Sequence, residues 1–147
     1  MPSIHIRVVN RSRHPLPEYA TPGASGMDVR AQLDGDLSLA PLERVLIPTG
    51  LFMEIPEGYE VQVRPRSGLA IKQGITCLNT PGTIDSDYRG ELKVILINLS
   101  GEPQTLHDGD RIAQLVVQKV EKAGWERAVE LGMTARAGGG FGHTGER

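Results

Sequence analysis

Turn signals recur along this chain at intervals of roughly eight to twelve residues, and this spacing limits the fold more than any other feature. The signals are Pro22-Gly23, Asp34-Gly35, Pro48-Thr49-Gly50, Pro56-Glu57-Gly58, Pro81-Gly82, Ser100-Gly101 and Asp108-Gly109. Short runs rich in Val, Ile and Leu lie between them. Short strands separated by regular turns are typical of antiparallel sandwiches and barrels, so the pattern predicts an all-β fold.

Hydrophobic periodicity indicates two kinds of strand. Period-two alternation, typical of half-buried strands, occurs at Ile4, Ile6 and Val8 and again at Val61 and Val63. Residues 92–97 and 112–117 are apolar at most positions, which predicts strands buried on both faces. The second face could meet another subunit or lie inside a wide two-sheet core, and the pattern leaves both possibilities open. A short helix is predicted from Ser67 to about Lys72.

Composition restricts the class of protein. The 147 residues fit one domain, and 16 basic against 18 acidic residues give a net charge of −2. This balance does not favour bulk nucleic-acid binding, which usually shows a basic patch. No run approaches the ~18 apolar residues of a membrane span. Cys77 is the single cysteine, and the first residues lack the apolar region of a signal peptide, so we expect a cytoplasmic protein without an internal disulfide.

Residues 82–91 form the most informative segment, and they read as a strand, a polar corner and a second strand. Asp85 and Asp87 are two apart, so on a strand they point to one face. Alone, the pair is more typical of a polar hairpin corner than of a metal site. Tyr88 adds a flat aromatic surface, although a single tyrosine is commonly a packing residue.

Three further features suit a phosphorylated ligand. Arg66 and Ser67 stand where the short helix begins, and helix N-termini and guanidinium groups both attract anions. Gln114 lies inside an apolar strand and needs a hydrogen-bond partner, either backbone or ligand. Residues 136–145 are rich in glycine, whose N–H groups can bind phosphate, and Phe141 can stack on a base. The alternative is a flexible tail.

In order and spacing, residues 24–29, 65–70, 82–91, 109–115 and 136–145 resemble the five motifs of the trimeric dUTPase family, which cleaves dUTP to dUMP and pyrophosphate. The resemblance implies an antiparallel β barrel or jelly roll of the β-clip type over residues 1–135. It also implies a homotrimer and a flexible arm, residues 136–147, that closes over the active site. Each site would combine motifs one, two and four of one subunit with the hairpin of a second and the arm of a third.

Roles for individual residues follow from the resemblance. Asp85 would be the general base for the water that attacks the α-phosphorus, and Tyr88 would lie against the deoxyribose. Asn79, with backbone groups of Ile84 and of residues near Lys93, would bind the uracil edge. The full substrate-binding set implied is Arg66, Ser67, Gly68, Asn79, Thr83, Ile84, Asp85, Tyr88, Lys93, Gln114, Arg136, Phe141 and Gly142.

The remaining implied roles concern phosphate and metal. Ser67 would bond oxygens near the scissile bond, and Gln114 would meet phosphate or the attacking water. Mg²⁺ would be held by the triphosphate, with Asp28 facing it through water. Arg136 would reach the γ-phosphate. Many family members have serine where this chain has His143, so the resemblance leaves open whether His143 or Thr144 contacts that phosphate.

Two other functions are alternatives to dUTP hydrolysis for a chain of this kind. The related dCTP deaminases share the fold and the trimer, and a non-catalytic regulatory module could use the same fold. The hairpin with Asp85 and the arm with Phe141 fit a dUTPase better than either. Such an enzyme would keep uracil out of DNA and supply dUMP for dTMP synthesis, with dUTP as its substrate and neither nucleic acid nor membrane as a partner.

Overall fold

The computed structural model describes residues 4–145, and within them it has ten strands and one short helix. The first sheet has the order β1 (Arg7–Asn10), β4 (Arg44–Glu54), β8 (Glu91–Asn98) and β6 (Ile75–Cys77). The second has the order β2 (Met27–Arg30), β10 (Arg111–Lys119), β5 (Tyr59–Arg64) and β7 (Gly82–Ile84). A two-stranded sheet joins β3 (Leu37–Leu39) to β9 (Gln104–Leu106).

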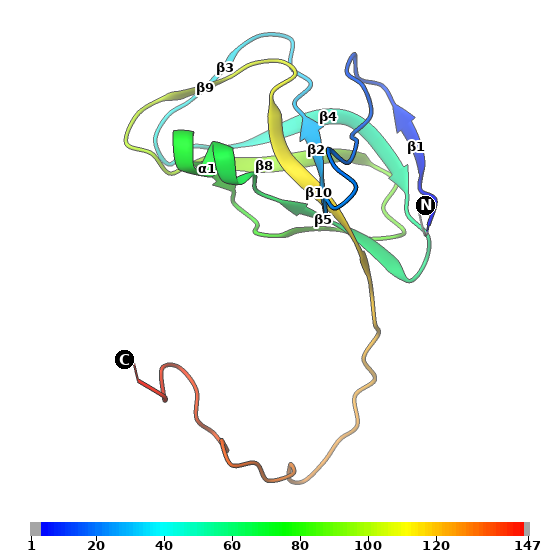
Figure 1. Cartoon of the computed structure of the whole chain (residues 1–147), viewed down its shortest axis with the longest axis vertical. Helices are drawn as coiled ribbons and strands as arrows, with labels where there is room; N and C mark the ends of the chain where they lie inside the picture. Colours follow the sequence, from blue (N-terminus) through cyan, green and yellow to red (C-terminus); the bar gives the residue numbers. More distant parts are fainter. Residues whose placement is uncertain (1–3, 146–147) are drawn as a thin grey trace.

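Every strand pair is antiparallel, which confirms the all-β antiparallel prediction. The helix α1 (Ser67–Gln73) confirms the predicted helix and ends at Gly74, whose left-handed φ of 66° suits a helix C-cap. No helix within residues 4–145 combines the length and the apolar character needed to cross a membrane. In Figure 1 the two larger sheets cross over one another, and α1 lies at one end of them.

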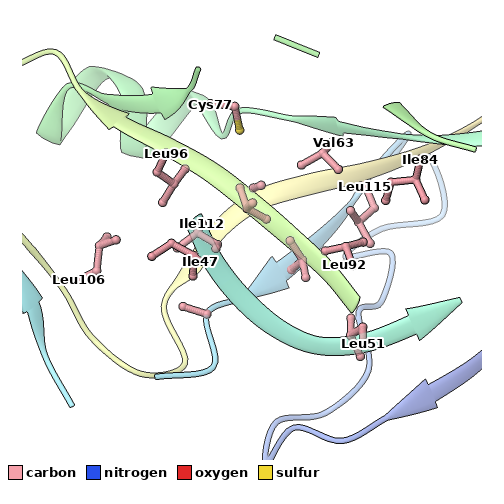
Figure 2. Close-up of a cluster of buried hydrophobic side chains, with 14 of the residues drawn as sticks. Ile47, Leu51, Val63, Cys77, Ile84, Leu92, Leu96, Leu106, Ile112 and Leu115 are labelled. Atoms are coloured by element: carbon pink, nitrogen blue, oxygen red, sulfur yellow. The ribbon is translucent and has the colours of Figure 1, made fainter. Parts of the chain in front are cut away.

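The hydrophobic core lies between the two four-stranded sheets. Figure 2 shows Ile47 and Leu96 of the first sheet close to Ile112 of β10, in the second sheet. Their side chains are at most 1% exposed. Val61 and Val63 of β5 are also buried, as their alternation predicted. Burial of such side chains contributes roughly 1.5–3 kcal/mol each before entropy losses, so this interface stabilises the fold and fixes the position of both sheets.

The strand over residues 92–97 differs from its prediction. In β8, Leu92, Val94 and Leu96 are buried, whereas Lys93 is exposed and Ile95 is half-buried. The prediction that both faces are buried is therefore wrong for β8 within one chain. It holds better for β10, where Ile112, Ala113, Leu115 and Val116 are buried and the register against β2 shifts between Arg111 and Ala113.

Two local predictions near the N-terminal strand are also wrong. Pro48-Thr49-Gly50 is no turn, because β4 runs through it with a register shift against β8. Thr49 Oγ1 donates to the Leu92 carbonyl at 2.5 Å, and Gly50 takes a φ of 72°. The strand predicted from Ile4 to Val8 begins only at Arg7, and Val8 is 40% exposed.

Asp108 connects three segments that are distant in sequence. Its carboxylate accepts the Leu33 N–H at 2.8 Å and Arg13 Nε–H at 2.9 Å, and it lies 2.9 Å from His14 Nε2. The backbone hydrogen bond from Leu33, followed by His14 and Arg13, holds the pKa of Asp108 well below its usual 3.8. A depressed pKa means that this carboxylate stabilises the fold above about pH 4 and loses that contribution as the pH falls further.

We expect Asp108→Asn to lower the melting temperature at pH 7 and to flatten its decline between about pH 4 and pH 2. The asparagine keeps the shape but not the charge that Arg13 and His14 meet. Asp34→Asn is the matched control, because Asp34 is fully exposed and its oxygen lies 3.7 Å from Arg13. Parallel melting curves for Asp108→Asn and the natural protein across this pH range would contradict the assignment.

The segment after β10 leaves the folded body. From Val120 to Gly145 the chain has neither helix nor strand, and Figure 1 shows it running away from the sheets. Large apolar side chains on it are nearly fully exposed: Trp125, Val129, Leu131 and Met133. The extended segment thus begins well before residue 136, and the division of the chain at 135/136 stays a prediction. Residues 1–3 and 146–147, included in the predicted body and arm, lie outside the described residues.

Candidate active site

Five of the predicted residues line one open hollow of about 630 Å³ beside the β7–β8 hairpin: Thr83, Ile84, Asp85, Tyr88 and Lys93. The rest of its lining comes from the first sheet, namely Leu46 and Phe52 of β4 and Glu91, Leu92 and Ile95 of β8. Apolar walls with a few polar groups are typical of a small-molecule site. The structure therefore joins the predicted base and the predicted sugar wall in one place.

The hairpin corner is held by bonds within its own backbone and side chains. Tyr88 N–H donates to the Asp85 carbonyl at 3.2 Å, which closes the turn. The Tyr88 hydroxyl folds back and donates to the Glu91 carbonyl at 2.8 Å. Arg89 donates to the Ser86 carbonyl at 2.6 Å. These bonds leave the Asp85 side chain exposed, and within residues 4–145 its carboxylate accepts no hydrogen bond, so it is free to take one from water.

Asn79 lies outside the lining of this hollow but close to the start of the hairpin. A Cβ on Gly82 would lie 3.0 Å from Asn79 Nδ2 and 3.3 Å from the Cβ of Val63. The absence of a side chain at position 82 therefore lets the amide approach the backbone of β7. The predicted uracil-binding role of Asn79 stays a prediction.

A second group of predicted residues meets where β2, β10 and β5 run side by side. Gln114 of β10 pairs with Asp28 of β2 on one side and with Arg64 of β5 on the other. Arg66 Nε–H donates to Asp28 Oδ1 at 3.1 Å, and an Arg66 terminal N–H donates to the Arg111 carbonyl at 3.0 Å. Asp28 thus holds the Arg66 guanidinium in place beside Gln114's strand.

Gln114 is half-buried, and its partner is backbone. Its Nε2 donates to the Pro65 carbonyl at 3.1 Å, which fixes the orientation of the amide. A Cβ on Gly26 would lie 2.6 Å from Gln114 Oε1, so the glycine leaves the space that the amide oxygen occupies. The sequence left open whether Gln114 bonds to backbone or to a ligand. The amide N–H group bonds to backbone.

Ser67 and Gly68 form the first turn of α1, directly after Arg66. Ser67 is exposed, the first turn contains no acidic residue, and no side chain caps the helix. A Cβ at Gly68 would meet nothing within 4 Å, so there is open space above this turn. The serine hydroxyl, the free backbone N–H groups and the neighbouring guanidinium can together receive an anion.

The donor set fits a metal ion that arrives with its ligand. Within residues 4–145 no group of three or more His, Cys, Asp or Glu side chains lies close enough to hold a metal ion. Each Asp28 carboxylate oxygen faces a guanidinium group: Oδ1 lies 3.1 Å from Arg66 Nε, and Oδ2 lies 3.5 Å from Arg111 Nη1. Mg²⁺ keeps several waters and usually binds through substrate phosphates and one or two carboxylates, which this arrangement permits.

Within residues 4–145 the two groups line no common hollow, and the described part of the arm, residues 136–145, joins neither. None of Asp28, Arg66, Ser67 or Gln114 lines the hollow beside the hairpin. On the arm, Arg136 Nε–H donates to the Gly139 carbonyl at 2.6 Å, Phe141 is fully exposed, and Gly142 has a φ of 84° in a turn. In Figure 1 this segment lies away from both sheets.

Several residues that support the site were not predicted from the sequence. Arg111 contacts Asp28, and three glycines lie under site side chains: Gly26 under Gln114, Gly82 under Asn79 and Gly90 under Tyr88. Each glycine stands in or next to a recognised motif. Their position there was the available signal, but the contact itself depends on strand register, which local sequence does not specify.

Known proteins resemble this chain over almost its whole length. The family model described as dUTPase matches residues 12–145. The deoxyuridine 5'-triphosphate nucleotidohydrolase of Finegoldia magna is 56% identical over 140 residues, covering 95% of this chain and 98% of the relative. Relatives with the same name, from Fusobacterium nucleatum among others, match at similar identity over nearly their whole length.

Solved structures agree in fold. The dUTPase of Staphylococcus bacteriophage 80alpha with dUPNHPP superposes with a TM-score of 0.86 at 24% identity, covering 96% of this chain and 98% of that one. A variant of the dUTPase from phage phi11 of S. aureus, described with a structural Mg(II) ion, gives 0.76 at 23% identity and covers 86% and 98%. With a family model matched over nearly its whole length and relatives more than half identical to it, the chain belongs to the dUTPase family.

Proposed function

We propose that this protein hydrolyses dUTP to dUMP and pyrophosphate. The observation that carries the proposal is the pairing of an exposed, unengaged Asp85 carboxylate with the Tyr88 ring in one hollow. A base for water and a flat wall for a sugar are what this reaction needs side by side. The full-length relatives named for the same activity support it. Its cellular consequence would be to keep uracil out of DNA and to supply dUMP for dTMP synthesis.

Asp85 accepts a proton from a water molecule in the proposed reaction. The water oxygen attacks the α-phosphorus, the bond from that phosphorus to the bridging oxygen breaks, and pyrophosphate leaves with the electron pair. Such a base must lie about one hydrogen bond from the water. Because the triphosphate is strongly negative, positioning and charge stabilisation supply most of the rate.

Arg66, Ser67 and Gln114 serve the phosphates in this proposal. Asp28 and the Arg111 carbonyl hold the Arg66 guanidinium in one orientation, so less side-chain entropy is lost when phosphate binds. Ser67 is exposed, and a Cβ at Gly68 would meet nothing within 4 Å, so there is room for a phosphate beside this turn. Asp28 is the residue that would face a Mg²⁺ ion through water, and such an ion, bound to the triphosphate, would neutralise the charge of the leaving group.

Substrate choice is assigned to the hairpin. Tyr88 lies against C2′ of the sugar and leaves no room for a 2′-hydroxyl, while Asn79 and the backbone near Ile84 and Lys93 read the uracil edge. An apolar wall rejects an added hydroxyl by only ~10²-fold, so the fit must be tight. Cytosine presents an acceptor at N3 and an amine at C4, so backbone groups fixed by the hairpin would exclude it.

A homotrimer brings the separate groups together in the proposal. Within one chain the hairpin residues and the Asp28–Arg66 group lie apart, and the arm contacts neither. Ile95 and Ile97 are only half-buried on the outer face of β8, and Trp125, Val129, Leu131 and Met133 are exposed, so apolar side chains remain that a second subunit could cover. Each site would take the phosphate group of one subunit, the hairpin of a second and the arm of a third.

The arm completes the site in this scheme. Phe141 covers the uracil, Arg136 reaches the γ-phosphate, and Gly142 and its glycine neighbours offer N–H groups to phosphate. The protein is proposed to act in the cytoplasm on free nucleotide, without a nucleic-acid or membrane partner. Cys77, buried and with its thiol pKa raised to about 11 by burial, takes no part.

Incubation with dUTP or dCTP in the presence of Mg²⁺ tests the proposed reaction. We expect one pyrophosphate per dUTP and neither pyrophosphate nor ammonia from dCTP. Ammonia from dCTP would indicate the related deaminase instead. No product from either nucleotide would indicate a non-catalytic module on the same fold, and binding of a non-hydrolysable dUTP analogue would then test whether the site still holds nucleotide.

A further inference from the structure

Gly90 stands out among the glycines near the site because the three atoms nearest to a side chain built there would all belong to Tyr88. A Cβ built at position 90 would lie 2.5 Å from Tyr88 Oη, 2.7 Å from Cζ and 3.0 Å from Cε1. At Gly26 and Gly82 the corresponding Cβ would also meet other residues, including backbone of Leu115 and the side chain of Val63. The tyrosine ring therefore crosses directly over the glycine.

The backbone does not explain the glycine at position 90. The φ angle of Gly90 is not positive, so an L-residue can adopt its conformation without left-handed strain. It sits just before β8, after the turn that the Tyr88 N–H closes on the Asp85 carbonyl. What position 90 requires is space for the aromatic ring.

We propose that Gly90 is a positioning residue for sugar selection, because its missing side chain sets where the Tyr88 ring stands. The ring lies over Gly90, and its hydroxyl donates to the Glu91 carbonyl at 2.8 Å. The Tyr88 side chain is therefore held at its Cα by the backbone and at its hydroxyl by this hydrogen bond. This inference rests on the proposed contact between Tyr88 and the deoxyribose. The inference assigns to Gly90 the role of positioning the Tyr88 ring against the sugar.

Moving the ring should affect selection and leave the fold intact. Tyr88 is 46% exposed and does not belong to the buried core, so the ring can swing into solvent without opening the core. An alanine methyl at position 90 occupies the space of Oη and Cζ and forces that swing. Because selection depends on a tight fit at C2′, a displaced ring no longer excludes the 2′-hydroxyl.

The test compares kcat/KM for dUTP and UTP in four variants: Gly90→Ala, Tyr88→Ala, the double variant and Gly101→Ala. Gly101 is the matched control, because its Cβ would meet nothing within 4 Å and its φ is not positive. We expect Gly90→Ala to lower the dUTP/UTP ratio at least about tenfold, within the ~10² that such a wall provides, with an unchanged melting temperature. Gly101→Ala should leave the ratio unchanged.

The double variant shows whether Gly90 acts through the ring. If it does, Gly90→Ala has no further effect on the ratio once Tyr88 is alanine, whereas independent effects would multiply. An unaltered ratio in Gly90→Ala beside a lowered ratio in Tyr88→Ala would overturn this inference alone. An unaltered ratio in Tyr88→Ala would remove the sugar wall itself. Loss of the fold in Gly90→Ala would also overturn the inference, since it assigns the glycine to the ring and not to the backbone.

Discussion

Asp85→Asn is expected to reduce kcat for dUTP by about 10²–10⁴-fold while the protein still folds and binds nucleotide. The asparagine has the same size, but its amide cannot take a proton from water. Asp85 is exposed and accepts no hydrogen bond within residues 4–145, so its replacement removes no contact that holds the hairpin. Steady-state kinetics with dUTP and titration with a non-hydrolysable analogue measure the two effects separately.

Asp87→Asn is the matched control for this prediction. Asp87 is an exposed carboxylate two residues further along the same turn, and it does not line the hollow that contains Tyr88. Its loss should change kcat by less than a factor of about two. Equal losses in both variants would indicate that the negative charge of the corner matters, and not a base at position 85. Turnover near the natural rate in Asp85→Asn would place the base elsewhere.

The sequence predicted the local chemistry of the fold well because that chemistry acts over short distances. Val61 and Val63 alternate in the sequence and are buried in β5, and the helix after Arg66 begins at Ser67. Pro48-Thr49-Gly50 was misassigned because proline and glycine suit both a turn and an irregular strand. What decided between them is the pairing of β4 with β8 on both sides of Gly50, which lies outside any local pattern.

The sequence identified candidate site residues, but it did not predict how they are arranged in space. Motif resemblance identified Asp85 and Tyr88, and the structure puts both in one hollow. Resemblance did not reveal that Asp28 would hold Arg66, since that contact depends on the registers in which β10 pairs with β2 and with β5. The exposed face of β8 has a similar explanation: apolar residues mark a surface for burial, but they do not say whether the same chain or another one covers it.

Removal of residues 136–147 is expected to lower kcat/KM for dUTP on the order of 10²-fold and to leave the melting temperature nearly unchanged. Within residues 136–145 the arm bonds only to itself and to Thr134, so its loss opens no core. Its proposed closure would exclude water and complete the site, so its loss should affect kcat/KM more than the stability of the fold. Kinetics and thermal melting of the truncated protein measure both quantities, and full activity would contradict a lid.

A longer truncation separates the lid from the assembly. Residues 120–135 carry Trp125, Val129, Leu131 and Met133, all nearly fully exposed in one chain, whereas residues 136–145 carry Phe141 as their only large apolar side chain. We therefore expect light scattering to give about three times 15.9 kDa for the natural protein and for the chain lacking 136–147. Removal of 120–147 should weaken the trimer. An unchanged trimer in both truncations would mean that residues 120–135 belong with the arm, and it would move the boundary of the folded body from residue 135 to Lys119, where β10 ends.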